Sequence, residues 1–375
     1  MAIELVKVSN KKDTRRFLDF SWEEPHRSLD IPVLHDVVRA MLDGSHPSCE
    51  YGDVEGWLLI RNNKVVGKTT LHTNRLFDEK LNEKVLIFGC ANIIDDQEVA
   101  DKFVSLLNTG ASQRGCTTIF GPASLLPNQH GGATVSHFDI PGFVDSAYTP
   151  EFFVTALRDR GFSQRFESHT WICDGLQDVD FDPSQLFAFD DDRIATENIE
   201  IHYGNRKKFN EQRELLLPLL NKSFSTLPYY TNIDQREFRF ATEGLEYLID
   251  EKLLIYLMRN NKPIAFVLVI PDISEFLIAC SGNLNFFHQS KLFFSRKKFR
   301  KKAILIIKGT DPDFAGMGYQ TLLHRELFTN LRNGGYEEMR STFVEHSNPG
   351  SAASYVRVDG HPLHDYCFFS AKVSP

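Results

Sequence analysis

The chain repeats one pattern at a nearly constant distance. The tetrapeptide Arg-Asn-Asn-Lys occurs at 61–64 and again at 259–262, each time between two apolar runs, and the copies lie 198 positions apart. One shared tetrapeptide can arise by chance, but several separated landmarks at one spacing indicate duplication of a whole domain. Two further landmarks recur within two residues of that spacing: an apolar segment at 3–6 with one at 199–203, and a segment at 157–162 with one at 356–361.

The composition is that of a globular protein with room for two such copies. Its 375 residues are enough for two domains that each bury a core. Hydrophobic residues make up 42% and charged residues 25%, which is typical of a soluble globular protein. The net charge of -8 argues against general nucleic-acid binding, although it is compatible with a local basic patch.

The apolar runs and the cysteines bear on location and metal content. No apolar run approaches the roughly 18 residues of a membrane span, and the first residues do not resemble a signal peptide. The six cysteines show no metal-binding spacing, and most lie in apolar runs, as buried thiols in a reducing compartment do. We therefore expect a cytoplasmic protein with no membrane partner and no metal.

The first half is predicted to alternate strands and helices. Apolar periodicity and turn residues predict a hairpin that turns at 62–63, and acids at 95–98 fit the first turn of a helix. The predicted strands are 3–8, the hairpin 56–76, 85–88, 117–120 and 164–173, and the predicted helices are 11–20, 31–43, 95–113 and 150–160.

The second half repeats this order, which predicts a mixed α/β sheet in each half. We expect a first domain at 1–177, an acidic linker at 178–197 and a second domain at 198–375. The predicted strands of the second half are 199–204, the hairpin 253–270, 303–307, 336–344 and 364–372, and its helices are 209–225, 235–249, 318–333 and 350–358.

This order of elements resembles the GNAT superfamily of N-acyltransferases over both halves. The resemblance implies two tandem acyl-CoA N-acyltransferase folds, each a mixed, mostly antiparallel sheet flanked by helices. In that family the donor binds where the fourth strand meets the next helix, because a glycine-rich turn there offers backbone N–H groups to the pyrophosphate. The resemblance assigns donor contacts in the second half to Thr310, Asp311, Gly316, Met317, Gly318, Tyr319 and Asn348.

The two halves differ at this turn. In the second half Gly318 holds the family's first glycine, but Ala315 replaces the expected Gln or Arg and Gln320 replaces the last small residue. Gln320 therefore adds a side chain where a phosphate should lie. The first half has no glycine at 93–99 and has three acids there. We therefore expect acetyl-CoA or another acyl-CoA to bind only the second half.

Two residues of the second half fit acid–base chemistry by the same resemblance. Asn348 is followed seven residues later by Tyr355, the spacing at which GNAT enzymes often carry a tyrosine that protonates the departing thiolate. Glu345, at the end of a predicted strand, is the candidate base for an attacking amine. The Gly-Phe pair expected after the tyrosine is replaced by Gly360 and His361, one residue late. The alternatives are a core or capping tyrosine and a solvated surface glutamate.

The first half carries an insertion at 121–143 that is rich in turn-forming residues. Such a segment suits a loop over a binding cleft, or a structural loop that packs one half on the other. It resembles a segment of bacterial proteins with two GNAT-like halves. His130, His137 and Asp139 do not have the spacing of a metal site, so we expect no metal there.

A basic run, Arg296–Lys302, precedes the central strand of the second half, and six of its seven residues are basic. Such a run is usually a solvated edge. The alternatives are a docking surface for an acyl carrier protein, for the 3′-phosphate of CoA or for tRNA. Fem-type aminoacyl-tRNA-dependent transferases also pair two GNAT-like halves.

Two classes of function therefore stay open. The first is an enzyme that moves an acyl group from acyl-CoA or another thioester carrier to an amine of a small molecule, or a transferase of the Fem type. The second is a catalytically inactive module that keeps the fold and binds a small molecule. The altered turn at Ala315 and Gln320 separates them, because only the enzyme needs a working donor site.

Overall fold

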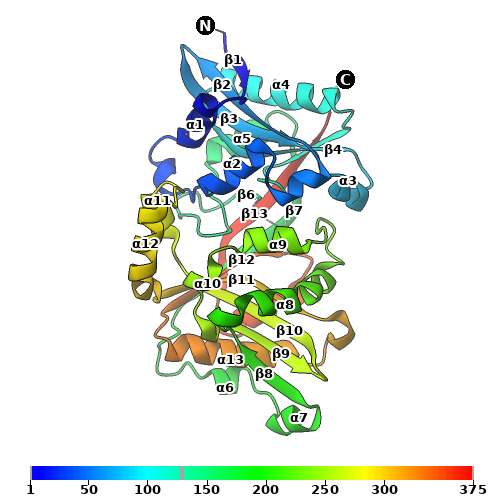
Figure 1. Ribbon diagram of the computed structural model, residues 1–375, viewed down its shortest axis with the longest axis vertical. Coiled ribbons are helices and arrows are strands. Elements are labelled where there is room, and N and C mark those ends of the chain that lie inside the picture. Colours follow the sequence, from blue (N-terminus) through cyan, green and yellow to red (C-terminus); the bar gives the residue numbers. More distant parts are fainter. Residues whose placement is uncertain (1, 127–130, 374–375) are drawn as a thin grey trace.

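The computed structural model describes residues 2–126 and 131–373 (Figure 1). Within these residues thirteen strands form one sheet that runs through both halves. The first half lies at the top of Figure 1 and the second half at the bottom, with helices on both sides of the strands. The mixed α/β architecture predicted from the sequence is therefore present, and a single sheet carries both copies.

The first half contains the predicted elements in the predicted order. The short helix α3 (Arg75–Leu81) and the short strand β6 (Ala133–Thr134) lie outside the prediction, because so few residues cannot show a hydrophobic period. The strands are β1 (Glu4–Lys7), β2 (Val54–Arg61), β3 (Lys64–His72), β4 (Val85–Ile93), β5 (Thr118–Gly121), β6 (Ala133–Thr134) and β7 (Ser163–Cys173). The helices are α1 (Lys11–Asp19), α2 (His35–Asp43), α3 (Arg75–Leu81), α4 (Gln97–Gln113) and α5 (Glu151–Arg158).

The rest of the chain repeats this order and adds helices at 183–186, 191–196, 274–279 and 286–295 that the sequence did not predict. The helix predicted at 235–249 is divided into two, at 235–241 and 245–248. The strands are β8 (Ile199–Tyr203), β9 (Leu254–Arg259), β10 (Lys262–Pro271), β11 (Lys302–Thr310), β12 (Glu338–Glu345) and β13 (His361–Lys372). The helices are α6 (Pro183–Leu186), α7 (Asp191–Thr196), α8 (Phe209–Phe224), α9 (Gln235–Ala241), α10 (Leu245–Leu248), α11 (Ser274–Ala279), α12 (Phe286–Ser295), α13 (Tyr319–Asn333) and α14 (Pro349–Val356).

The duplication is visible in the backbone of two hairpins. The β2–β3 and β9–β10 hairpins each turn at two asparagines with positive φ: 53° at Asn62, 61° at Asn63, 51° at Asn260 and 60° at Asn261. Two consecutive residues in this region form a type I′ turn, which matches the twist of the flanking strands. In each half the strand after the hairpin then pairs parallel with the next, β4 with β5 and β11 with β12.

The last strands of the two halves are exchanged. The order across the sheet is β1-β2-β3-β4-β5-β13-β7-β12-β11-β10-β9-β8. The final strand β13 (red in Figure 1) pairs with β5 of the first half, whereas β7 pairs with β12 of the second. The domain boundaries at 177 and 198 remain a prediction, but a strand from outside those boundaries completes each half of the sheet.

The segment at 178–197, predicted as an acidic linker, packs on the second half through α6 and α7. Phe187 is buried, and its ring stacks on Phe328 of α13 with ring centroids 5.2 Å apart. Arg325 of α13 forms an ion pair of 2.9 Å with Asp191. The aromatic residues among the acids give this segment an apolar side to bury, so it is more than a solvated connection.

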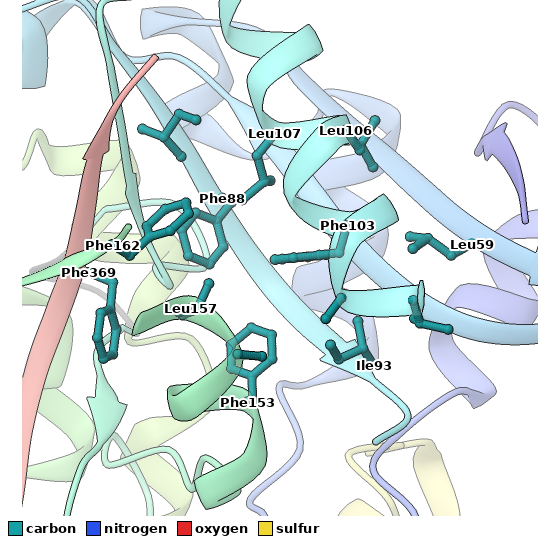
Figure 2. Close-up of a cluster of buried hydrophobic side chains, with 14 of the residues drawn as sticks. Leu59, Phe88, Ile93, Phe103, Leu106, Leu107, Phe153, Leu157, Phe162 and Phe369 are labelled. Carbon is teal, nitrogen blue, oxygen red and sulfur yellow. The ribbon is translucent and has the colours of Figure 1, made fainter. Parts of the chain in front are cut away.

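The core of the first half lies between its sheet and the helices α4 and α5. Figure 2 shows Phe103 of α4 and Phe153 of α5 near Phe88 of β4. The rings of Phe88 and Phe103 meet edge to face, with centroids 5.9 Å apart. Phe369 of β13 joins the same cluster. Burial of one such ring stabilises the fold by about 1.5–3 kcal/mol, so this core helps to hold the exchanged strand.

Candidate functional site

A cavity of about 670 Å³ lies in the first half, where β4 and β5 separate. The two strands pair from Val85 to Ile87 of β4, and the chain leaves β5 after Gly121. The loop that follows crosses β4 closely, because a Cβ on Gly89 would lie 1.9 Å from the carbonyl oxygen of Ala123. Only glycine permits this crossing, which places the loop against the cavity.

The second half supplies part of the cavity wall through the connection between α11 and α12. The backbone N–H of His35 donates to the carbonyl oxygen of Gly282 at 3.0 Å. A Cβ on Gly282 would lie 2.7 Å from the carbonyl oxygen of Val33, so the two segments touch. The cavity therefore depends on both halves. The residues of this wall are Ile278, Cys280, Ser281 and Asn283.

Asp30 places a carboxyl group in the cavity wall. Burial raises its pKa to about 7, although the charge of Lys68 and backbone hydrogen bonds from Ile31 and Tyr148 act in the opposite direction. A carboxyl group with a pKa near 7 is partly ionised at neutral pH and can accept a proton from a reacting group. Asp30 is not among the residues predicted from the sequence, where its one signal is that it is a lone acid between the apolar residues Leu29 and Ile31.

Lys68 of β3 brings a positive charge to the same cavity. Its ammonium donates to the carbonyl oxygens of Phe17, at 3.1 Å, and Phe20, at 2.5 Å, at the end of α1. The last carbonyls of a helix lack helical partners, so a cation is favourable there. Burial lowers the pKa of Lys68. An ammonium has three N–H groups, and these two bonds to described residues leave one for a bound oxygen.

The strand β4 is bent beside the cavity at Cys90. The φ angle of Cys90 is 46°, and the register between β3 and β4 shifts between Lys68 and Thr70. Such bulges often lie next to functional sites. Burial raises the pKa of the Cys90 thiol, whose sulfur lies 3.8 Å from the hydroxyl oxygen of Ser124. Cys90 is therefore not an activated nucleophile.

The insertion at 121–143 has both of the roles considered from the sequence: it lies at a cavity, and it packs one half on the other. It lines the cavity through Pro122–Ser124 and Gly131–Gly132. Phe143 is fully buried in a hydrophobic cluster formed mainly by the second half. The insertion therefore lines the cavity and also packs one half on the other.

The predicted absence of a metal concerned His130, His137 and Asp139. His130 lies in the segment 127–130, outside the described residues. His137 and Asp139 are exposed. Within residues 2–126 and 131–373 there is no group of three His, Cys, Asp or Glu side chains placed to hold a metal ion.

The donor turn predicted in the second half ends in a free helix terminus. Helix α13 begins after Gly318, which has a φ of 84° and provides no side-chain cap. Gly316 has a φ of 77° and open space around it. Uncapped N–H groups suit an anion. Asp311 and Asp313, however, place two carboxylates nearby, both paired with Lys222 at 2.7 and 2.6 Å.

Two residues of this turn bond to neighbouring parts of the chain. The amide nitrogen of Gln320 donates to the hydroxyl of Thr310 at 2.7 Å, so this side chain bonds to the end of β11. The carbonyl oxygen of Met317 accepts a hydrogen bond from Arg193 of α7 at 3.1 Å. Helix α7 therefore borders the turn.

Two further predicted donor contacts have structural partners. Tyr319 is buried, and its hydroxyl donates to the carboxylate of Glu197 at 2.5 Å. The side chain of Asn348 caps α14, because its oxygen accepts from the backbone N–H of Ser351 at 3.2 Å. Their assignment to donor binding stays a prediction.

The first half has no free helix end at its corresponding turn. The carboxylate of Asp96 accepts from the backbone N–H of Val99 at 3.1 Å and pairs with Arg61 at 2.7 Å. The chain's own carboxylate thus occupies the helix terminus at which a phosphate would bind. A pyrophosphate does not fit there without displacing Asp96.

The predicted acid and base of the second half lie outside the cavity. Tyr355 is 1% exposed and stacks on Trp171, with ring centroids 5.6 Å apart. Burial raises the pKa of Tyr355, which makes it a weaker acid. Burial also raises the pKa of Glu345, at the end of β12. Among the described residues the two side chains do not contact each other, and their catalytic roles stay predictions.

The split between β11 and β12 is filled. The two strands pair only as far as Leu305 and Ser341. Beyond that point the Lys308 ammonium donates to the hydroxyl of Ser354 at 2.7 Å and to the carbonyl oxygen of Ser351 at 3.0 Å. Burial lowers the pKa of Lys308 to about 7. Lys308 therefore ties β11 to α14 at the place that corresponds to the cavity of the first half.

The fold matches solved structures of acetyltransferases. A tandem GNAT protein from the clavulanic acid biosynthesis pathway has a TM-score of 0.57 at 11% identity, over 100% of this chain and 99% of that chain. A fungal GCN5-related glucosamine N-acetyltransferase region has a TM-score of 0.58 at 15% identity, over 99% and 38%. A GCN5-related N-acetyltransferase from Sphaerobacter thermophilus has 0.51 at 11%, over 85% and 81%. The chain therefore has the tandem GNAT fold that its sequence predicted.

Two curated proteins are similar in sequence. Protein YghO of Escherichia coli (strain K12) is 23% identical over 289 residues, which are 77% of this chain and 73% of YghO. The bacterial ceramide synthase of Caulobacter vibrioides is 20% identical over 285 residues, 76% of this chain and 73% of that protein. No protein-family model matches the chain. Alignments of this length include parts of both halves.

Proposed function

We propose that this protein transfers an acyl group from a thioester to the amine of a long-chain lipid. The observation that carries the proposal is the cavity of the first half with Asp30 in its wall. Its volume of about 670 Å³ lies within the range of about 300–1,000 Å³ typical of small-molecule sites. The solved proteins that share the fold are N-acetyltransferases by name, which supports N-acylation as the class of reaction.

The proposed acceptor rests on the lining of the cavity and on one relative. The walls combine charged groups with aromatic and aliphatic side chains, among them Phe17, Phe20, Trp22, Val38 and Phe153. Such a lining suits a molecule with a charged head and a long apolar chain. The relative named bacterial ceramide synthase supports the same class, since a ceramide is the amide of a long-chain amino alcohol and a fatty acid.

The chemistry assigned to the cavity uses two charged groups. Asp30 takes a proton from the ammonium of the acceptor, which frees the lone pair of the nitrogen. The nitrogen attacks the thioester carbonyl carbon, the C–N bond forms and the C–S bond breaks. The proton held by Asp30 passes to the departing thiolate. The regenerated carboxylate then takes the second proton from the new amide nitrogen and releases it to solvent, so one ammonium and one thioester give one amide, one thiol and one proton. The Lys68 ammonium stabilises the negative charge that develops on the carbonyl oxygen.

The turn before α4 limits which group can carry the acyl thioester. Because Asp96 caps α4, the phosphates of a CoA thioester have no place at the turn of the first half. The donor is then a thioester whose carrier lies largely outside the cavity. Acyl-CoA and an acyl group on a carrier protein both meet this condition, and the assay below compares them.

The test is formation of an amide by the purified protein. Palmitoyl-CoA or palmitoyl carrier protein is supplied with a long-chain amino alcohol, and amide and free thiol are measured by mass spectrometry. We expect the two products in equal amounts. In Asp30→Asn we expect the rate to fall about 100-fold or more, because the base is lost.

The matched control for this test is Asp36→Asn. Asp36 lies on α2 with an exposed side chain that pairs with Arg39 at 2.6 Å. Its substitution makes the same chemical change outside the cavity, and the variant should keep the wild-type rate. Equal rates in wild type and Asp30→Asn would show that Asp30 is not the base and would remove the main support for the proposal.

A second function is binding of a long-chain amine without reaction. It is favoured because the free helix end of α13, where the phosphates of a donor would bind, and the cavity lie in different halves. A binding protein would be stabilised against heating by the amine alone. It would also form no amide with either donor. The amide assay therefore separates the two functions, and the thermal shift measurement tests whether the amine binds.

A further inference from the structure

One helix of the second half presents an apolar side to solvent. Four phenylalanines of α12 are exposed: Phe286 (77%), Phe287 (80%), Phe293 (40%) and Phe294 (84%). At 3.6 residues per turn they fall within roughly 120° of the helix circumference. Leu292, on the opposite side, is buried against α11. The helix therefore packs on the protein by one side and presents a second apolar side to solvent, where, within the described part of the chain, only Phe293 contacts a ring outside the helix, that of the exposed Tyr247, with centroids 6.4 Å apart.

This helix belongs to a part of the second half that has no counterpart of similar length in the first. The connection between β3 and β4 covers 73–84 and carries only the short α3. The connection between β10 and β11 covers 272–301 and carries α11 and α12, which lie at the edge of the molecule in Figure 1. Contiguous exposed apolar side chains of this kind mark interaction surfaces.

Positive charge lies beside the four rings. Lys291 is exposed within α12, and Lys297 and Lys298, just after it, are exposed and form no ion pair with described residues. The guanidinium of Arg296 lies over the ring of Phe293, 4.3 Å from its centroid. Two other basic residues of the run are paired, Arg300 with Asp250 at 3.3 Å and Lys301 with Glu337 at 2.9 Å.

We propose that α12 and the basic residues next to it dock this protein on an anionic lipid surface. Rings on one side of a helix enter the headgroup region of a bilayer, and nearby lysines attract acidic headgroups. Other partners fit this surface less well. An acyl carrier protein or tRNA would bind the basic residues but leave the four rings in water, and a second copy of the chain would place two basic runs next to each other, where they repel. Among the described residues no helix has the length and apolar character of a membrane span.

Docking at α12 brings the cavity close to the lipid. Asn283 lines the cavity, and α12 begins at Phe286, directly after its cap Asn285. The same connection thus carries the docking residues and part of the cavity wall. A long-chain amine in the bilayer then lies close to the cavity. The docking rests on α12 alone and does not require the proposed reaction.

The test is cosedimentation with vesicles of phosphatidylcholine, with and without phosphatidylglycerol. The wild type should bind the anionic vesicles. In Phe287→Gln/Phe294→Gln the partition coefficient should fall at least about tenfold, because two rings no longer leave water. Lys297→Glu/Lys298→Glu should weaken binding to anionic vesicles only. The control Val179→Gln/Leu215→Gln changes two exposed apolar residues elsewhere and should bind like the wild type.

A second measurement reports the depth of insertion. In Phe294→Trp the indole emission should shift to shorter wavelength with vesicles and be quenched by lipids brominated on their chains. Absence of vesicle binding by the wild type, or equal binding by the phenylalanine variant, overturns the proposal. Two other results, obtained without vesicle binding, would also overturn it. One is a dimer of the protein that the phenylalanine substitutions dissociate, and the other is binding of an acidic carrier protein or of RNA that depends on Lys297 and Lys298. Vesicle binding without amide formation supports the docking and removes the proposed reaction.

Discussion

The two halves share a fold but divide its features between them. The first half has a cavity at the split between β4 and β5, and its helix end is capped by Asp96. The second half has a free helix end after Gly318, and its split is filled by Lys308 and α14. The resemblance to GNAT enzymes predicts the donor turn and the reacting groups in one domain, the second half. Duplication allows each copy to keep one feature, so similarity to the pattern does not locate the reaction.

The largest expected effect shows which half carries out the reaction. We expect Asp30→Asn to lower the rate of amide formation about 100-fold or more and Tyr355→Phe to lower it less than about tenfold. Asp30 lines the cavity, whereas the hydroxyl of Tyr355 is enclosed and its pKa is raised by burial. Initial rates at saturating donor measure the ratio.

A reversed ratio would place the reaction in the second half, as the sequence predicts. In that case Glu345→Gln should also lower the rate, because Glu345 is the predicted base there. If Asp30 is the base, the wild-type rate should rise as pH increases through about 7, where its carboxyl group ionises. Asp30→Asn should lose that rise.

The fold could be predicted largely from the sequence because its elements show their period and repeat. The Asn-Asn turns at 62–63 and 260–261 predict both hairpins, and both are type I′ turns. The exchange of β7 and β13 could not be predicted, since either copy of a final strand fits either half. Helix α12 was not predicted, because the phenylalanines on its exposed side obscure the periodicity of the apolar residues on its buried side. A helix with apolar residues all round shows no clear period.

The site was less accessible to prediction than the fold. Asp30, Lys68, Cys90 and Ser124 come from four separate segments, and no spacing in the sequence relates them. The glycine turn of the second half was identified because it is a local motif. Motifs of this kind report backbone conformation, and the two glycines do have positive φ. They do not report whether the neighbouring cleft is open, which depends on packing by α14.

The next effect concerns the lysine that fills the second split. Burial lowers the pKa of Lys308 from 10.5 to about 7. Between these values the unfolded chain binds a proton that the folded chain lacks, so this group makes the wild type more stable as pH rises. Lys308→Met removes that contribution. The difference in unfolding free energy between wild type and variant should change by about 2–4 kcal/mol from about pH 7 to about pH 10, measured by chemical denaturation.

Asp30 provides the opposite slope as a control. Burial raises its pKa from 3.8 to about 7, so the folded chain holds a proton that the unfolded chain releases. This group therefore makes the wild type less stable as pH rises from about 4 to about 7, and Asp30→Asn should remove that loss. Similar slopes in both variants would mean that the titrations do not come from these two groups.

A smaller effect tests the free helix end of the second half. Millimolar acyl-CoA should raise the melting temperature of the wild type by a few degrees if its phosphates bind there. Gly316→Trp should abolish this shift by blocking the approach to the turn. Gly335→Trp is the matched control, because Gly316 and Gly335 both have a φ of 77° and open space around them. Both variants should lose about 1 kcal/mol of stability, yet only the control should keep the shift.

The smallest effect tests whether the two hairpin turns are equivalent. Asn63→Gly and Asn261→Gly each create the Asn-Gly pair that type I′ turns favour, and glycine takes φ near 60° without steric cost. The added freedom of glycine in the unfolded chain offsets part of this gain, so each variant should gain about 0.3–0.5 kcal/mol. The double variant should show the sum, because the turns lie in different halves. Urea denaturation measures the three values. A gain at one turn and a loss at the other would mean that the copies have diverged even in the tetrapeptide that they still share.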